Sequence, residues 1–246
     1  MLQISYFALL ALILAMIFVG TSLTLKRMNT PPQKRKSILL KVTFGLIAWF
    51  AYVFTLSSTG FIESRDLPPR MPLLGILPTF LFTAFFLTTR RFDNFIKAIP
   101  ASWLIYYQSF RIIVELIIWS TFLEGIIPKN TTFEGTNLDV MAGLTAPVVA
   151  YLVYNKRALP ENFALAWNFA SIAILAVTVF TFISTTFFPS IWANQYHIDI
   201  KAFASFPYVF IPTFFMPSAF FVHFVYVSKY FRKNSTKAKT ALHAQS

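Results

Sequence analysis

The 246-residue chain contains no cysteine, only three histidines and only nine acidic residues. Without cysteine there are no disulfides, no thiolate metal ligands and no cysteine nucleophile. The histidines, His197, His223 and His243, are widely separated and match no metal-binding spacing, which argues against a metal-dependent enzyme. We therefore expect no metal, no other cofactor and no catalytic residue of these kinds.

Charge is also scarce. Only 12% of the residues are charged, whereas 57% are hydrophobic and 30 are Phe. Soluble domains usually carry about 25% charged residues, and a soluble chain with this much apolar surface would precipitate. The composition is that of a helical membrane protein, whose partner is the lipid bilayer. The net charge of +12 then reflects loop charges that set the topology, and no nucleic-acid partner is expected.

Seven stretches are long and apolar enough to cross a bilayer as helices, for which about 20 residues are needed. They lie near residues 3–25, 37–59, 72–89, 101–123, 138–155, 163–188 and 206–228, and the gaps between them are too short for a soluble domain. The sequence predicts an all-α, polytopic membrane protein. Residues 1–246 form a single seven-transmembrane-helix bundle, in which residues 229–246 are a basic tail.

Most of the 21 basic residues fall in loops on one side of these spans, including Lys34–Lys36 and the tail from Lys229. The other side has only Arg65, Arg70, Lys129 and Lys201, together with most of the acidic residues. Because cytoplasmic loops collect Lys and Arg, the amino terminus is expected outside and the carboxyl terminus in the cytoplasm. This topology is that of a multi-pass membrane protein.

The fourth span holds the two ionisable residues that no loop explains, Arg111 and Glu115. With Gln108 they lie on one face of a helix, because residues three and four apart are neighbours on its surface. Arg111 is expected near the bilayer centre, where an ionised side chain costs at least about 2.5 kcal/mol. We expect Arg111 to pair with Glu115, with guanidinium donors left for Gln108, water or an anionic ligand.

Two interpretations of this pair stay open. In the first, Arg111 and Glu115 neutralise one another and fix the packing of neighbouring helices. In the second, they line a site for a substrate, an ion or a proton, because ionisable residues inside membranes are usually functional. Position in the sequence does not decide between them.

The outer loop before the fifth span supplies three further candidates, Glu134, Asn137 and Asp139. Thr136 and Asp139 have the spacing of a capping box, which would explain Asp139 as part of a helix start. Alternatively, the three candidates form a polar mouth above Glu115 and give cations or protons a route inward.

The sixth and seventh spans contribute milder groups. Asn168 begins a polar stripe that continues through Ser171, Thr178 and Thr185, a pattern more typical of helix packing than of a site. His223, in the seventh span, is a candidate proton relay together with Glu115. The competing interpretation of His223 is a hydrogen-bonded structural residue.

Several of these residues also carry a resemblance to a known family. The stretch from Gln108 to Leu116, Ile127–Pro128, Thr132–Gly135, Asn137, Asp139 and Gly143–Pro147 resembles an uncharacterised family of seven-helix bacterial membrane proteins. The resemblance covers about a fifth of the chain. It implies a bacterial membrane protein and singles out the same polar residues, but it implies no activity.

Together these observations predict an inner-membrane protein that transports or binds a small anionic or zwitterionic solute at an intramembrane polar site. The expected binding residues are Gln108, Arg111, Glu115, Glu134, Asn137, Asp139 and Asn168. Two alternatives stay open. One is a metal-free, lipid-modifying enzyme in which Arg111 holds a lipid phosphate, and the other is a non-catalytic receptor or assembly partner with a structural Arg–Glu pair. We expect transport or binding rather than catalysis.

Overall fold

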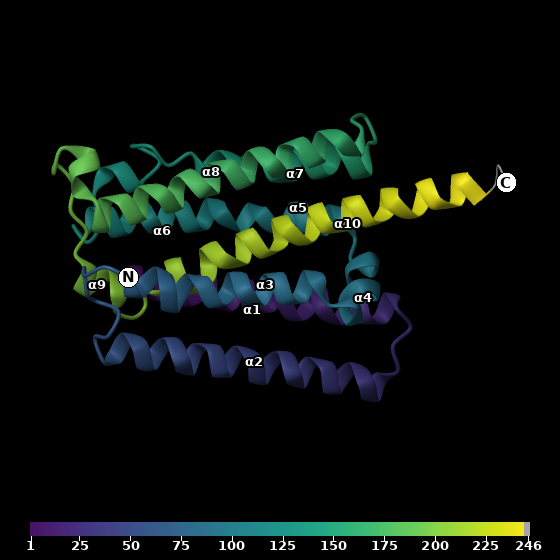
Figure 1. The fold of residues 1–246 in the computed structure, drawn as a ribbon, viewed down its shortest axis with the longest axis horizontal. Helices are drawn as coiled ribbons and strands as arrows, with labels where there is room; N and C mark the ends of the chain where they lie inside the picture. Colours follow the sequence, from purple (N-terminus) through teal and green to yellow (C-terminus); the bar gives the residue numbers. More distant parts are fainter. Residues whose placement is uncertain (244–246) are drawn as a thin grey trace.

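The computed structural model describes residues 1–243, with side chains described through Asn234. All regular elements in this range are helices (Figure 1). The longer ones are α1 (Leu2–Arg27), α2 (Pro32–Ser58), α3 (Leu77–Thr88), α6 (Arg111–Leu123), α7 (Asp139–Ala150), α8 (Glu161–Phe187) and α10 (Met216–His243). The shorter ones are η1 (Pro72–Ile76), η2 (Arg90–Phe92), α4 (Asp93–Ala98), α5 (Ala101–Tyr107), η3 (Gln108–Phe110), η4 (Lys129–Thr131), η5 (Tyr151–Asn155), η6 (Pro189–Trp192), α9 (Ile200–Ala204) and η7 (Ile211–Phe215).

The prediction of an all-helical chain is confirmed for the described residues, and the apolar helices are compatible with an integral membrane protein. Five helices are long and apolar enough to cross a membrane, and a sixth span results if the bent pair Pro72–Thr88 and Arg90–Ala98, which turns by 72°, is counted as one. Asp139–Asn155 coincides with the predicted fifth span but is shorter than these, with 12 residues of α-helix and 5 of π-helix. The last predicted span begins at Ile211 rather than near residue 206, because residues 205–209 form a bend and turns.

The predicted tail over residues 229–246 differs from the structure. Helix α10 continues to His243 instead of ending near residue 228, and residues 244–246 lie outside the described residues. Basic side chains at residues 229–233 of α10 form hydrogen bonds and ion pairs with the rest of the bundle. Lys229 donates to the backbone carbonyl of Lys97, Arg232 pairs with Asp93, and Lys233 pairs with Glu161. The first basic residues of the tail therefore belong to the folded bundle.

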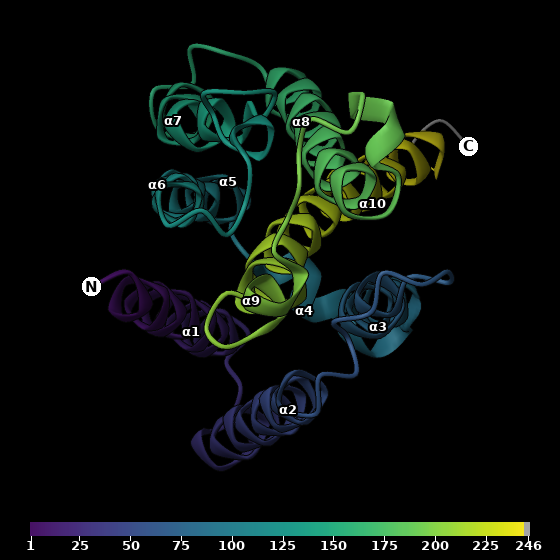
Figure 2. The same cartoon turned by 90° about the vertical axis from the view of Figure 1, so that its left-hand side faces the viewer.

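The long helices lie side by side along the long axis of the molecule, and the two termini are at opposite ends (Figure 1). An end view shows α10 in the middle, with α1, α6, α7, α8 and α3 around it and α2 outermost (Figure 2). Burial agrees with this order. In the most apolar window of each helix, 67% of the residues are buried for the span of α10 but only 6% for α2.

Hydroxyl side chains in these apolar helices bond to their own backbone. Thr83, Thr121 and Thr181 each donate to the carbonyl four residues earlier, at 2.7–3.0 Å. Without water, a hydroxyl group needs such an internal partner, and the preceding turn of a helix provides one. The numerous Thr residues are thus compatible with a membrane-embedded bundle.

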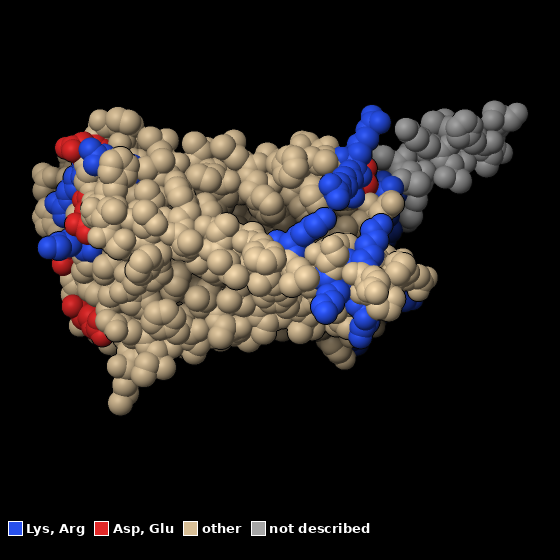
Figure 3. Space-filling model, turned by 90° about the horizontal axis from the view of Figure 1, so that it is seen from below, with Lys and Arg blue, Asp and Glu red and all other residues tan. Residues whose placement is uncertain are grey.

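Charged side chains gather at the two ends of the molecule and leave an uncharged belt between them (Figure 3). One end carries Lys and Arg almost alone, whereas the acidic side chains are mostly at the other end, with a few basic ones. Such a belt suits the hydrocarbon region of a bilayer, which excludes exposed charge.

Helix α7 approaches α6 closely at Gly143. A Cβ atom at this position would lie 2.9 Å from the backbone nitrogen of Ile112 and 3.4 Å from the carbonyl carbon of Arg111. Only glycine allows this approach, because no side chain fits between the two backbones. Since Asp139 lies one turn before Gly143, the close contact also sets its distance from Arg111.

We predict that Gly143→Val destabilises the fold by about 1–3 kcal/mol, the usual cost of overpacking. Gly45→Val is the matched control, because Gly45 is also inside a helix but a Cβ there meets nothing within 4 Å. Thermal unfolding of the two purified variants measures the difference. Equal unfolding temperatures would contradict the close packing of α6 and α7.

Candidate functional site

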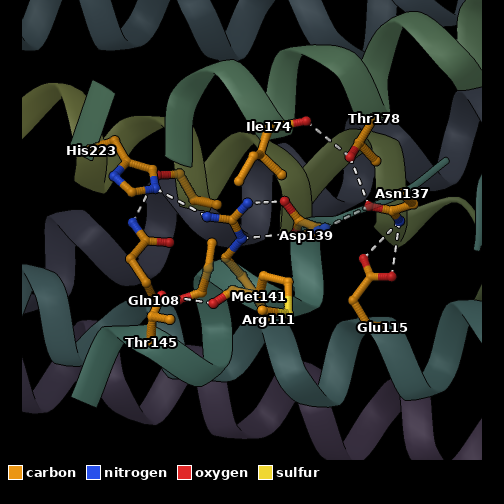
Figure 4. Close-up of polar contacts among 12 residues, drawn as sticks. Gln108, Arg111, Glu115, Asn137, Asp139, Met141, Thr145, Ile174, Thr178 and His223 are labelled. Atoms are coloured by element: carbon orange, nitrogen blue, oxygen red, sulfur yellow. Dashed lines mark hydrogen bonds and ion pairs between the residues drawn. The ribbon is translucent and has the colours of Figure 1, made fainter. Parts of the chain in front are cut away.

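A cluster of polar side chains lies inside the bundle, between two apolar cores. One core gathers residues such as Tyr6, Ile118 and Phe215, and the other gathers residues such as Ile105, Ala150 and Tyr226. The members of the cluster are almost fully buried, each with 3% exposure or less. They are Gln108, Arg111, Glu115, Asn137, Asp139, Asn168 and His223 (Figure 4).

The central contact is an ion pair between Arg111 and Asp139. The Nε atom of Arg111 donates to Oδ2 of Asp139 at 2.8 Å, and its Nη2 pairs with Oδ1. The two side chains are only 1% and 4% exposed. This is a two-point guanidinium–carboxylate pair in a low-dielectric setting, the geometry in which arginine binds a carboxylate best.

The predicted pairing of Arg111 with Glu115 is therefore wrong, because among the described residues Arg111 forms its ion pair with Asp139. The capping-box interpretation of Thr136 and Asp139 is wrong as well. Asp139 is the first residue of α7 and its carboxylate turns to Arg111, while its backbone N–H donates to Oδ1 of Asn137 at 2.9 Å. The physical reason is a difference in free energy: leaving a buried guanidinium unpaired costs far more than leaving a helix N-terminus without a side-chain cap.

His223 binds the other side of the guanidinium. Its Nε2 atom lies 3.2 Å from Nη1 of Arg111, and its Nδ1 lies 2.8 Å from Oδ1 of Asn168. Arginine can only donate, so Nε2 accepts and the ring proton is on Nδ1, which donates to Asn168. The amide of Asn168 in turn donates to the carbonyl of Ala164 at 2.8 Å. His223 is thus a neutral imidazole with both nitrogens bonded.

Glu115 has a sparser environment. Both of its oxygens accept from the same Nδ2 atom of Asn137, each at 2.9 Å, and the described side chains provide it with no ion pair. An ionised carboxylate has about four acceptor sites, so one amide leaves most of them unused. Asn137 is held by Thr178, which donates to its Oδ1 at 2.8 Å, and by the carbonyl of Thr131 at 3.1 Å.

A cavity of about 60 Å³ borders this cluster. Its polar lining consists of Arg111, Glu115, Asp139 and two threonines. The remaining lining residues are apolar: Met71 and side chains of η1, η3, α6, α8, α9, η7 and α10. This volume holds a few water molecules or one small charged group, since a single water needs roughly 10–15 Å³ measured in this way. The surroundings of Arg111 are therefore not packed solid.

The remaining predicted residues are placed as follows. Gln108 donates to the carbonyl of Ala219 at 3.2 Å, while its own Oε1 is buried with no hydrogen-bond partner. Glu134 does not join the cluster. It accepts from Nε1 of Trp119 at 2.9 Å and lies 3.4 Å from Lys129, in a loop where its side chain is 39% exposed. Of the three residues of the predicted polar mouth, Asn137 and Asp139 thus join the buried cluster and Glu134 does not.

Thr178 belongs to the site although the sequence interpretation assigned it to helix packing. The feature of the sequence that could have indicated this role is the polar stripe on α8. Its members are all buried: Asn168, Ser171, Thr178 and Thr185. The stripe serves both roles, because Asn168 and Thr178 contact the cluster while Thr185 binds Asn130 of the outer loop. In the described part of the chain, no three His, Asp or Glu side chains gather as metal ligands do.

The fold and the cluster are those of an all-helical chain, compatible with an integral membrane protein, that buries several polar and ionisable side chains. Residues 68–229 match the family described as a domain of unknown function (DUF8737), and the chain belongs to this family. All seven residues of the cluster lie inside the matched range, whereas α1 and α2 lie outside it. No curated protein and no solved structure matches the chain.

The Arg111–Asp139 pair can be tested by a double-mutant cycle. We predict that Arg111→Met or Asp139→Leu alone costs about 3–5 kcal/mol, because each leaves an uncompensated buried charge, and that the double variant costs less than the sum. Lys129→Met removes one charge of an exposed pair and should change stability by at most about 1 kcal/mol. Unfolding by denaturant in micelles measures all four variants, and additive losses would refute the coupling.

Proposed function

We propose that the chain is an inner-membrane protein of bacterial type that crosses the membrane seven times. The shortest segment, Asp139–Asn155, has 17 residues and at 1.5 Å per residue is about 26 Å long, close to the roughly 30 Å of a hydrocarbon core. The charge distribution supports an external amino terminus, because the end rich in Lys and Arg is the one expected in the cytoplasm (Figure 3).

The topology is testable because the chain has no cysteine of its own. Single cysteines at the exposed positions Glu134 and Gln195 should react with an impermeant thiol reagent in intact cells. Cysteines at Arg91 and Lys156, which are exposed at the opposite end, should react only after the membrane is permeabilised. Labelling of the second pair in intact cells would reverse the proposed orientation.

The proposed function is the binding of a small solute, for transport, at the site formed by Arg111, Asp139 and Glu115. The observation that supports it is the unequal treatment of the two carboxylates. Asp139 is neutralised by Arg111, whereas Glu115, only 1% exposed, accepts from one amide and faces a cavity. In a purely structural cluster every charge would be paired, and no cavity would lie beside a carboxylate.

Charge balance narrows the kind of solute. With a neutral His223, the ionised forms of Arg111, Asp139 and Glu115 add up to one negative charge. A net charge is costly in this setting, so a proton or a cationic group has to accompany the Glu115 carboxylate. Of the two solute classes expected from the sequence, the zwitterionic one fits better, because its ammonium group can pair with Glu115. An anion would have to compete with Asp139 for Arg111.

We favour binding over catalysis because the Glu115 carboxylate contacts an amide rather than a second proton-transfer group. His223 cannot serve as its partner in this arrangement, since both of its nitrogens are engaged by Arg111 and Asn168. Proton relay from Glu115 to His223 would first require the guanidinium to move.

The binding proposal predicts that methylammonium, the simplest probe of the cationic group, binds the wild-type protein and not Glu115→Gln. The substitution keeps the shape of the side chain and removes its charge, so at least a tenfold loss of affinity is expected. Glu134→Gln is the control, because Glu134 lies outside the cluster. Isothermal titration of protein in nanodiscs measures binding, and equal affinities for wild type and Glu115→Gln would refute the proposal.

A further inference from the structure

The cavity beside Glu115 is lined by charged side chains at one end and almost entirely by apolar side chains elsewhere. Its inner end is formed by Arg111, Glu115 and Asp139, and from there it extends between η1 and α8 toward Phe187 and Ile200. Along this course its side chains are apolar apart from Thr178 and Thr186. A hydrated solute entering here would lose its water against an apolar wall, with no compensating hydrogen bonds until the end.

The cavity has η1 on one side and α8 on the other, with η7 and the start of α10 beneath them. Helix η1 packs on η7, and α8 packs on α10, which continues η7. The lining residues on these two flanks, such as Ile76, Val179 and Ile183, are only half-buried, whereas Phe110, Val114 and Ala219 at the bottom are buried. The apolar cleft is therefore flanked by half-buried side chains of η1 and α8 and closed at its floor.

Size and charge set requirements on an occupant. About 60 Å³ is enough for a small head group but not for a large polar solute. The inner end carries an excess negative charge when Glu115 is ionised, as the pairing of Arg111 with Asp139 leaves Glu115 without a counterion. The complementary molecule has a compact cationic end and an apolar remainder that begins in the cleft.

We infer that the ligand of this site is an amphiphile with a primary ammonium group and an apolar chain. It enters between η1 and α8, and its ammonium group pairs with Glu115. The first methylene groups lie against the apolar lining, and the rest of the chain extends from the cleft toward the lipid. The inference rests on the proposed binding at Glu115 and adds the chemical class of the ligand and its route. In a membrane, such a molecule would reach the cleft from the bilayer without passing through water.

The experiment compares methylammonium, butylammonium and octylammonium on the protein in nanodiscs, with affinities referred to the free aqueous concentration. Burial of a methylene group in an apolar site should tighten binding about fourfold, so affinity should rise steeply from butylammonium to octylammonium. Subtracting binding to Glu115→Gln nanodiscs removes partitioning into the lipid. Octyl sulfate has the same chain with the opposite charge and should show no binding that depends on Glu115.

Two variants test the route. Ile183→Trp places a bulky ring on the lining of the cleft and should weaken octylammonium at least tenfold while methylammonium still binds, which also shows that the variant is folded. Val177→Trp is the matched control, because Val177 lies on the same helix, is 52% exposed and does not line the cleft.

The outcomes separate the two proposals. Equal affinity for methylammonium and octylammonium, an unchanged octylammonium affinity in Ile183→Trp, or binding of octyl sulfate as tight as that of octylammonium would overturn the amphiphile and leave binding at Glu115 standing. If no ammonium probe distinguishes wild type from Glu115→Gln, binding at Glu115 itself is refuted, and the inference with it.

Discussion

The buried guanidinium of Arg111 is the constraint on which the interior of this protein depends. An unpaired charge in an apolar bundle is too costly, so the surrounding helices must deliver partners to it. Asp139 comes from the start of α7 and His223 from α10. Gly143 allows α7 to approach the backbone of Arg111 and Ile112 closely enough for the ion pair. The contacts that neutralise Arg111 are therefore the same contacts that pack α6, α7 and α10 together.

The pairing of Arg111 leaves Glu115 in an unusual position. The side-chain amide of Asn137 donates to Glu115. Its Oδ1 accepts hydrogen bonds from the Thr178 hydroxyl and from the backbone N–H of Asp139, so the outer loop, α6 and α8 meet at this amide. The site thus combines a neutralised pair, which is suited to structure, with a carboxylate beside a cavity, which is suited to binding. We therefore assign the structural interpretation to Asp139 and the proposed binding to Glu115.

Much of the fold could be predicted from composition and hydropathy. The seven predicted stretches coincide with helical segments to within a few residues at most boundaries, because apolar runs of this length have no alternative to helix in a membrane. The exceptions have local causes. Residues 205–209 form a bend and turns before η7, and α10 runs beyond residue 228, where Arg232 and Lys233 pair with Asp93 and Glu161. Such distant partners leave no mark in a hydropathy pattern.

The sequence by itself determined that the chain is helical and apolar, that its charges divide between two ends, and that Arg111 and Glu115 share a helix with Gln108. It also marked Asn137, Asp139, Asn168 and His223 as exceptions in their segments. Only the tertiary structure decided which of them meet. Residues four apart on one helix are neighbours in any fold, but Asp139 is 28 positions from Arg111 and His223 is 112 positions away. Their contacts depend on how α7 and α10 are rotated and how closely they pack, and helical periodicity contains no information about either.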